Sequence, residues 1–273
     1  MNIDGEALLT GLVALARRAG GAILKVYDED FDVMTKEDES PLTHADLASH
    51  RVITAALPEL LSNVPILSEE SGAIDEAERL AWTRYWLIDP LDGTKEFVNR
   101  NGEFTVNIAL IDDHRPVIGV VHVPVADQTY TGIVGAGAWR QDGDAAPVPI
   151  ATRRPPARPP VVVGSRSHAN PDLAACLDQI GEHELVSMGS SLKFCRVAEG
   201  AADLYPRLGP TSEWDTAAAQ AVVEAAGGQV LRLDGAPLAY NEKRDILNPW
   251  FVVLGDPDAG WLERLRDGGV RMA

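Results

Sequence analysis

Hydrophobic residues in the first half of the chain follow first a helical and then a strand-like spacing. Within residues 6–27, one helical face carries Leu8, Leu12, Leu15, Ala19 and Ile23. A second helix is expected at about residues 46–60. Strands are expected at residues 31–35, 64–68, 85–88, 104–111, 117–123 and 129–134, and a polar loop at residues 36–41. Turn residues separate the last three strands, which predicts an antiparallel meander.

The pattern changes after residue 142. Residues 142–160 are rich in Pro, Ala and Arg, which is typical of a linker whose arginines face solvent. Strands are then expected at residues 161–163, 184–187, 203–205, 229–233 and 251–254, and helices at 172–180, 190–199 and 215–226. This alternation indicates an α/β arrangement. We therefore predict an α/β protein with an α+β half at residues 1–145, a linker at 146–160 and an α/β half at 161–273.

One short segment, residues 85–97, combines a buried strand with several polar groups. Pro90 cannot donate to a ladder, so Asp89 is expected at the end of the strand with its carboxylate pointing out of the sheet. Asp92 begins an Asp-Gly turn, and Thr94 follows where a helix could begin. This arrangement suits a hard cation and a phosphate, but the same residues also fit an ordinary strand–turn–helix corner.

Acidic residues also stand at the ends of other expected elements. The strand at residues 64–68 runs into Glu69 and Glu70, and Asp215 precedes an alanine-rich helix. Asp46 falls in the first turn of the early helix, where an acid suits the helix dipole without any further role. The acids that could converge on one site are Glu69, Asp89, Asp92 and Asp215. Carboxylate oxygens are the protein ligands that Mg²⁺ prefers.

Composition narrows the classes of function. The chain has 273 residues, 45% of them hydrophobic, which is enough for a sizeable core, and we expect neither a membrane span nor a secretory signal. A net charge of −17 disfavours nucleic-acid binding but does not exclude a small anionic ligand. Cys176 and Cys195 are too few for a disulfide framework, which favours buried thiols in the cytoplasm. His44 and His50 have no partners at zinc-binding spacing.

Clustered acids that hold cations answer a specific chemical problem. Phosphate monoester hydrolysis is so slow that enzymes accelerate it by up to about 10²¹-fold. One hydrogen-bond donor contributes only about 10²–10³-fold. Two metal ions about 3.5–4 Å apart can activate the attacking water and stabilise the leaving oxygen together.

Three segments carry a resemblance to a known family. Residues 68–71 (Ser-Glu-Glu-Ser), 89–94 (Asp-Pro-Leu-Asp-Gly-Thr) and 214–218 (Trp-Asp-Thr-Ala-Ala) resemble the signatures of the lithium-sensitive, Mg²⁺-dependent inositol-monophosphatase superfamily. Residues 85–111 and 189–208 are similar to its bacterial 3′(2′),5′-bisphosphate nucleotidase branch, which serves sulfate assimilation. The resemblance runs in order over nearly the whole chain. It implies the layered αβαβα sandwich of the inositol-monophosphatase and sugar-phosphatase type.

The resemblance also implies metal ligands. Glu69, Asp89 and the Leu91 carbonyl would hold a first Mg²⁺. Asp89, Asp92 and Asp215 would hold a second, and a weaker third ion would lie near Glu69.

The resemblance further implies the groups that act on water and phosphate. Thr94, oriented by Asp46, would help to deprotonate the attacking water, and the Gly93 and Thr94 amides would bind phosphate oxygens. Glu70 is expected to be a structural neighbour or to lie in the outer shell of the metal site. The complete set of implied substrate contacts is Glu69, Leu91, Asp92, Gly93, Thr94, His168, Ser190, Lys193, Arg207 and Asp215.

Substrate choice is expected to depend on the second half of the chain. Ser190, Lys193, Arg207 and His168 resemble the nucleotidase site for a second phosphate that is held and not cleaved. The implied substrates are adenosine 3′,5′-bisphosphate, which gives AMP and phosphate, and 3′-phosphoadenylyl sulfate. Without the resemblance, these cations would be interpreted as solvated charges.

Alternatives remain open at the level of sequence. An inositol monophosphatase would share the metal chemistry and differ only in its pocket, and a catalytically silent nucleotide or metal sensor would share the fold. Residues 190–193 also fit the S-x-x-K pattern of serine acyl-transfer enzymes, but no S-D-N or K-T-G companion occurs. The expected location is the cytoplasm, with peripheral association at the inner membrane as the alternative. The sequence leaves the oligomeric state open.

Overall fold

The computed structural model describes residues 5–28, 34–35, 41–42, 44–72, 74–166 and 171–267. The helices are α1 (Gly5–Tyr27), α2 (His44–Leu60), α3 (Glu76–Leu80), α4 (Thr94–Val98), α5 (Pro171–Ile180), α6 (Leu192–Ala198), α7 (Ala217–Ala225) and α8 (Trp261–Asp267), with a 3₁₀ turn at Pro257–Ala259. The strands of the first half are β1 (Met34–Thr35), β2 (Pro41–Leu42), β3 (Ile66–Ser68), β4 (Arg84–Asp92), β5 (Thr105–Asp112), β6 (Arg115–Val123), β7 (Gln128–Ile133), β8 (Gly137–Asp142) and β9 (Val148–Ile150). Those of the second half are β10 (Val161–Ser165), β11 (Glu184–Met188), β12 (Leu204–Arg207), β13 (Gln229–Arg232) and β14 (Phe251–Leu254).

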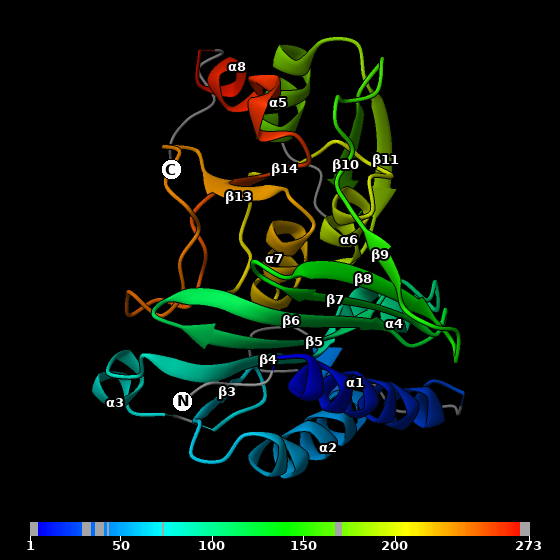
Figure 1. Cartoon of the computed structure of the whole chain (residues 1–273), viewed down its shortest axis with the longest axis vertical. Helices are drawn as coiled ribbons and strands as arrows, with labels where there is room; N and C mark the ends of the chain where they lie inside the picture. The colour runs from blue at the N-terminus through cyan, green and yellow to red at the C-terminus, as the bar shows by residue number, and fades with distance from the viewer. Residues whose placement is uncertain are drawn as a thin grey trace.

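Two large sheets form separate layers (Figure 1). The seven-stranded sheet has the order β3-β4-β5-β6-β7-β8-β9, and its strands are antiparallel except for the parallel pair β3–β4. The meander predicted for the first half is therefore confirmed. The five-stranded sheet has the order β11-β10-β12-β14-β13, with parallel pairs on the β11 side and antiparallel pairs on the β13 side. β1 and β2 form a small antiparallel pair of their own.

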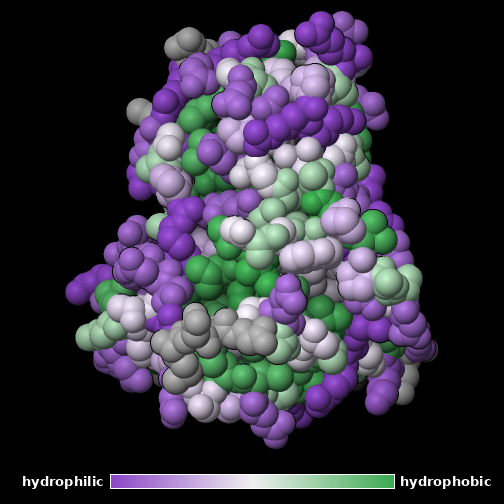
Figure 2. Space-filling model, viewed as in Figure 1, coloured by the Kyte–Doolittle hydropathy of each residue, from purple (hydrophilic) through white to green (hydrophobic). Residues whose placement is uncertain are grey.

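Helices cover the outer faces of the sheets and fill the space between them (Figure 1). One hydrophobic cluster packs α1 and α2 against the large sheet. A second joins the other face of that sheet to α6, α7 and the five-stranded sheet, and a third packs α5 and α8 on the outer face. This order of layers confirms the predicted αβαβα sandwich. On the face shown in Figure 2, hydrophilic residues cover the region of α5 and α8, while hydrophobic residues gather lower down, over the large sheet.

The helix α1 is long and apolar enough to cross a membrane by length and composition alone. Its apolar face, however, is buried in the protein, with Leu12, Ala19 and Ile23 fully enclosed. Gly20 lets α1 approach β6 closely, because a Cβ there would lie 2.6 Å from the His122 ring. We therefore interpret α1 as a core helix.

The strand β4 differs from its predicted form, because it continues through Pro90 to Asp92. Its parallel partner β3 ends at the Ser68–Ile88 pair, so no strand on that side needs a donor from Pro90. On the β5 side, the pairing passes from Asp89 to Asp92 while β5 advances by only two residues, which is a β-bulge. The expectation that the strand ends at Asp89 is wrong, but the ladder is interrupted there.

The segment predicted as a solvated linker also carries structure. β9 lies within residues 146–160 and pairs with β8. Arg153 forms an ion pair with the buried Asp203 at 2.7 Å between Nη2 and Oδ2. Arg153 is therefore bound to the protein surface by this carboxylate. The prediction that the arginines of the linker are purely solvated is wrong for this residue. The division of the chain into two halves stays a prediction. Most of the strand predicted at 31–35 and the loop at 36–41 lies outside the described residues, which include β1 and Pro41.

Candidate metal centre and active site

The bulge in β4 places two acids, Asp89 and Asp92, on one edge of the large sheet. Asp89 is only 1% exposed, and its Oδ1 accepts a hydrogen bond of 3.0 Å from the Leu91 amide. This bond fixes the carboxylate and leaves Oδ2 for another ligand. Leu91 itself is buried, and Ser49 of α2 donates to the neighbouring Pro90 carbonyl at 2.7 Å. The corner is therefore held from both the sheet and the helix layer.

The second acid of the corner, Asp92, is held through a single oxygen. Its Oδ2 accepts from the Ser191 amide at 2.5 Å and more weakly from Thr105 Oγ1 and Asn107 Nδ2, each at 3.4 Å. Ser191 Oγ donates to Asn107 Oδ1 at 2.8 Å, which turns the Asn107 amide so that its N–H points to Asp92. Three donors on Oδ2 leave Oδ1 available for a cation.

Ser191, Thr105 and Asn107 were not predicted as site residues. Ser191 lies within residues 189–208, which carried the family resemblance, so the sequence had already indicated that this segment belongs to the site. Thr105 and Asn107 lie two residues apart on β5 and thus share one face of the strand. That pair of polar side chains in an otherwise apolar run was the available signal.

Asp215 reaches the same place from the second half of the chain. It lies in the turn that leads into α7, and its Oδ2 accepts from the Ser212 amide at 2.9 Å. Asp89, Asp92 and Asp215 each offer a carboxylate oxygen within 4.8 Å of the others. Asp215 therefore meets Asp89 and Asp92, although it lies far from both in sequence.

A second acidic group lies beside the first. Asp46 of α2, Glu69 and Glu70 also offer oxygens within 4.8 Å of one another. Asp46 is buried, whereas the two glutamates follow β3 and are partly exposed. The structure thus brings Asp46 and Glu69 together, and it adds Glu70, which had been expected to be a structural neighbour or to lie in the outer shell.

The electrostatics of the first group favour the binding of cations. Burial, followed by repulsion from Glu69, Asp92 and Asp215, raises the pKa of Asp89 well above its usual range. Burial also raises the pKa of Asp92, and burial with repulsion from Asp92 raises the pKa of Asp215 to about 8. A bound divalent cation would remove this repulsion. Because every donor in both groups is oxygen, the set fits a hard cation such as Mg²⁺.

A cleft of about 280 Å³ opens beside these acids. Of the predicted site residues, those that line it are Glu69, Asp92, Gly93, Thr94, Ser190, Lys193, Arg207 and Asp215. Asp46, Asp89 and Leu91 are buried and do not line it. His168 lies outside the described residues. The cleft therefore gathers both metal-type and substrate-type residues from the two halves of the chain.

At Gly93 the two halves of the chain approach each other closely. Its φ of 94° belongs to the left-handed region, and a Cβ would lie 3.3 Å from the Ser190 Cβ. Only glycine adopts this conformation readily. Thr94 follows as the first residue of α4.

The same cleft also contains two cations, Lys193 and Arg207, which we call its basic side, as distinct from the acids, its acidic side. Lys193 Nζ donates to the Ser190 carbonyl at 2.5 Å and lies 5.5 Å from the centre of the Tyr205 ring. Arg207 Nη2 donates to the Pro210 carbonyl, while its buried Nε has no hydrogen-bond partner among the described residues. Burial lowers the pKa of Lys193 to about 8, although the negative charge of Asp92 opposes the shift. Two cations held with few acceptors favour an anionic ligand.

Comparison with known proteins agrees with this geometry. A model of the inositol monophosphatase family matches residues 4–258. The 3′(2′),5′-bisphosphate nucleotidase CysQ of Escherichia coli (strain K12) is 52% identical over 90% of this chain and 99% of its own length. Its counterpart in Haemophilus influenzae is 37% identical over 94% of this chain and 96% of its own.

Solved structures give the same result for the fold. The crystal structure of CysQ from Bacteroides thetaiotaomicron has a TM-score of 0.81 and 41% identity, and the alignment covers 92% of this chain and 98% of that one. An inositol monophosphatase from Thermotoga maritima has a TM-score of 0.78 at 20% identity, with 97% and 99% of the two chains covered. The second match concerns the fold alone.

Proposed function

The chain belongs to the inositol monophosphatase family, and from this premise we propose that it is a metal-dependent 3′(2′),5′-bisphosphate nucleotidase. It hydrolyses the 3′-phosphate of adenosine 3′,5′-bisphosphate to give AMP and phosphate, and it acts in the same way on 3′-phosphoadenylyl sulfate. The observation that carries the proposal is one cleft that Lys193 and Arg207 line together with members of two acidic groups, Glu69, Asp92 and Asp215. The similarity to CysQ over 90% of the chain supports it.

We assign the acids to two or three Mg²⁺ ions. Glu69, Asp89 and the Leu91 carbonyl would hold the first ion, and Asp89, Asp92 and Asp215 would hold the second. A weaker third ion would be held near Glu69. When bound, the ions supply positive charge that makes water a better nucleophile and stabilises the leaving oxygen.

The chain's own groups position the phosphate and move the proton. The amides of Gly93 and Thr94 donate to the oxygens of the phosphate that is cleaved. The hydroxyl of Thr94, oriented by Asp46, takes the proton of the attacking water while it passes its own proton to the Asp46 carboxylate. The water oxygen bonds to phosphorus as the bond between phosphorus and the 3′-oxygen breaks, and the 3′-oxygen takes a proton from solvent. Thr94 lines the cleft, and Asp46 lies in the acidic group with Glu69, which supports this assignment.

The basic side of the cleft selects the substrate. Lys193 and Arg207, with Ser190 and His168, hold the second phosphate, which is not cleaved. The buried Arg207 Nε, which has no partner in the described part of the chain, supplies one donor for it. A substrate with a single phosphate gains nothing from these residues.

Two further properties belong to the same proposal. Lithium inhibits by taking the place of a Mg²⁺ ion. The enzyme acts in the cytoplasm, which agrees with the buried, unpaired Cys176 and Cys195.

A substrate panel tests the proposal. Phosphate release is measured with adenosine 3′,5′-bisphosphate, 3′-phosphoadenylyl sulfate, inositol 1-phosphate and fructose 1,6-bisphosphate, each with Mg²⁺ and after exhaustive chelation. We expect the two nucleotides to be preferred, and only with Mg²⁺. A preference for inositol 1-phosphate would overturn the substrate assignment, and full activity after chelation would overturn the metal assignment.

A further inference from the structure

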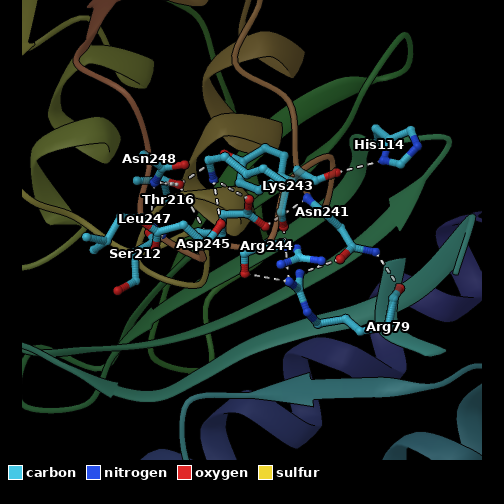
Figure 3. A network of polar contacts seen from close by, with 12 residues as sticks. Arg79, His114, Ser212, Thr216, Asn241, Lys243, Arg244, Asp245, Leu247 and Asn248 are labelled. Atoms are coloured by element: carbon cyan, nitrogen blue, oxygen red, sulfur yellow. Dashed lines mark hydrogen bonds and ion pairs between the residues drawn. The ribbon is translucent and has the colours of Figure 1, made fainter. Parts of the chain in front are cut away.

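A buried network of polar groups joins α3 to the segment that follows Tyr240 (Figure 3). Its central residues are Arg79, Asn241 and Glu213, which we call the Arg79 clasp. Arg79 is 7% exposed, Asn241 1% and Glu213 0%. None of the three was singled out by the sequence patterns. Their burial requires an explanation, because buried polar groups are costly unless they are paired.

Arg79 uses its guanidinium to hold one short piece of chain. Nη1 donates to Asn241 Oδ1 at 2.5 Å, and Nη2 donates to the carbonyls of Lys243 at 3.0 Å and Arg244 at 2.9 Å. Asn241 Nδ2 donates back to the Arg79 carbonyl at 2.7 Å. The two residues are thus bonded in both directions, although 162 positions separate them.

The segment that Arg79 holds, which begins at Asn241, in turn fixes the carboxylate of Glu213. Its backbone has φ 58°, a left-handed conformation that costs free energy for a residue other than glycine. In this conformation its amide donates to Glu213 Oε2 at 2.8 Å, while Lys243 Nζ donates to Oε1 at 3.1 Å. Both oxygens of the buried carboxylate are therefore fixed by the segment that Arg79 holds.

Glu213 belongs to the turn that presents Asp215. The Glu213 amide donates to the Ile246 carbonyl at 2.9 Å, and the Glu213 carbonyl accepts from Thr216 Oγ1 at 3.1 Å. Asn248 Nδ2 completes the turn by donating to the Ser212 carbonyl at 2.8 Å and to Thr216 Oγ1 at 3.0 Å (Figure 3).

The other end of the clasp lies beside the second acidic group. Arg79 belongs to the first half of the chain, ten positions after Glu69. A groove on this side of the molecule is lined by Glu69 and Arg79 from the first half and by Trp214 and Ile246 from the second. The clasp thus connects α3, which lines a groove together with Glu69, to the turn that carries Asp215.

We propose that the Arg79 clasp is a positioning device that fixes Asp215 relative to Glu69 and thereby sets the affinity of the site for divalent cations. The proposal rests on the metal assignment of the proposed function. Arg79, Asn241 and Glu213 do not line the catalytic cleft, so they act through Asp215 and do not touch substrate. Groups that orient metal ligands typically change metal affinity or activity by about 10–100-fold when they are removed.

Asn241→Gly is the sharpest variant. Glycine accepts the left-handed conformation and keeps the amide that donates to Glu213, so only the side-chain bonds to Arg79 are lost. Asn241→Asp keeps the acceptor for Arg79 but loses the donor to the Arg79 carbonyl, and it serves as the intermediate variant. Arg79→Lys is an independent change, because one ammonium group cannot span the acceptors that the guanidinium holds.

Arg244→Ala is the matched control. The Arg244 side chain is 85% exposed and pairs on the surface with Glu76, and the carbonyl that Arg79 uses remains. This variant therefore removes a charge from the same segment and leaves the clasp intact.

The experiment measures Mg²⁺ binding by calorimetry, beside kcat at saturating Mg²⁺ and the thermal midpoint. We expect Asn241→Gly and Arg79→Lys to weaken Mg²⁺ binding about tenfold. The kcat at saturating Mg²⁺ should stay within about twofold, because excess metal restores the ligand set. Arg244→Ala should bind Mg²⁺ as the wild type does, and Asn241→Asp, which keeps one of the two bonds to Arg79, should lose less affinity than Asn241→Gly.

An unchanged Mg²⁺ dissociation constant with a lowered thermal midpoint would assign the clasp to folding alone and overturn the proposal. If Asn241→Gly does not fold, Arg79→Lys carries the same test. Calorimetry needs no substrate, so a wild type that binds Mg²⁺ but prefers inositol 1-phosphate would overturn the substrate assignment and leave the clasp result valid. A wild type that binds no Mg²⁺ would overturn both.

Discussion

The two sides of the cleft differ in how their charges are held. On the acidic side, each of Asp89, Asp92 and Asp215 has one oxygen fixed by a hydrogen bond from a backbone amide. On the basic side, Lys193 and Arg207 each donate to a carbonyl three positions away in the chain, and the Arg207 Nε has no partner among the described residues. The acids are therefore fixed by the fold, whereas the cations are held locally.

This difference matches the two tasks that we propose: the acids bind the metal ions for the chemical step, and the cations select the substrate. Burial raises the pKa values of Asp89, Asp92 and Asp215, and repulsion from neighbouring acids adds to the shifts of Asp89 and Asp215. The pKa of Lys193 is lowered, because its charge is buried with too little compensation. Each side thus lacks the charge that its proposed ligand brings, which is Mg²⁺ for the acids and a second phosphate for the cations.

The largest expected effect comes from the centre of the acidic side. Asp89→Asn should abolish turnover, because Asp89 is the ligand that we assign to both ions. The fold should survive, since the amide keeps an acceptor for Leu91 N–H and removes a repelling charge. Phosphate release and the thermal midpoint without Mg²⁺ check both points. Substantial turnover by this variant would show that the acids do not form a shared metal centre.

The second prediction separates the proton acceptor from the metal ligands on the same side. Thr94→Ala and Asp46→Asn should lower kcat by about 10²–10⁴-fold through the loss of general base catalysis. Calorimetry should show that they bind Mg²⁺ much better than Asp92→Asn or Asp215→Asn. Equal loss of metal binding in the two sets would place Thr94 and Asp46 among the ligands and remove the distinction.

The sequence predicted the two sides of the cleft unequally well. Asp89 and Asp92 could be predicted from the sequence because a proline and a glycine mark the corner. Asp215 could be predicted because it precedes a clear helix. The bulge in β4 was missed, since a proline within a strand is tolerated only where the neighbouring strand has ended, and that depends on the length of β3. Lys193 and Arg207 looked like solvated charges, because burial of a cation has no local pattern.

Contacts between distant segments were beyond prediction for a related reason. Ser191 reaches Asp92 across 99 positions, and Arg79 reaches Asn241 across 162. In neither pair does the local sequence pattern around one residue indicate which residue will be its partner. The short elements β8, β9, α3 and α8 were also absent from the predicted list, because their few apolar residues gain order mainly from neighbouring strands and helices.

The third prediction concerns the basic side. Lys193→Ala and Arg207→Ala should raise KM for adenosine 3′,5′-bisphosphate by about ten- to a hundred-fold, because a charge-assisted hydrogen bond contributes about 1.5–3 kcal/mol. Hydrolysis of inositol 1-phosphate should hardly change, which makes it the internal control. If both substrates suffered equally, these cations would belong to the catalytic centre or to the fold, and the contrast between the two sides would fail.

The smallest expected effect, and the most direct comparison of the two sides, is their dependence on pH. Burial and repulsion from Asp92 raise the pKa of Asp215 to about 8, so protons compete with Mg²⁺. The deprotonated fraction of such a group rises from about 9% at pH 7 to about 50% at pH 8, so Mg²⁺ affinity should rise about fivefold over this range. Calorimetry in two buffers of different ionisation enthalpy should detect the released proton.

The same shift makes the metal-free protein sensitive to base. Because the pKa of folded Asp215 lies above the ordinary value of 3.8, its contribution stabilises the fold below about pH 4 and is lost as the pH rises to about 8. The thermal midpoint of the metal-free protein should therefore fall over this range, and saturating Mg²⁺ should restore it. Asp215→Asn should flatten the fall, and an unchanged slope in that variant would assign it to another group.

On the basic side, a rise in pH should weaken ligand binding, whereas on the acidic side it strengthens Mg²⁺ binding. With a pKa of about 8, Lys193 loses its charge as the pH rises above that value. The KM for adenosine 3′,5′-bisphosphate should then increase while Mg²⁺ binding is at its strongest, and the KM for inositol 1-phosphate should not follow. Lys193→Arg should remove the increase, since arginine keeps its charge throughout this range. A parallel increase for both substrates would mean that the acidic side controls substrate binding as well, and the two regions would no longer be separable.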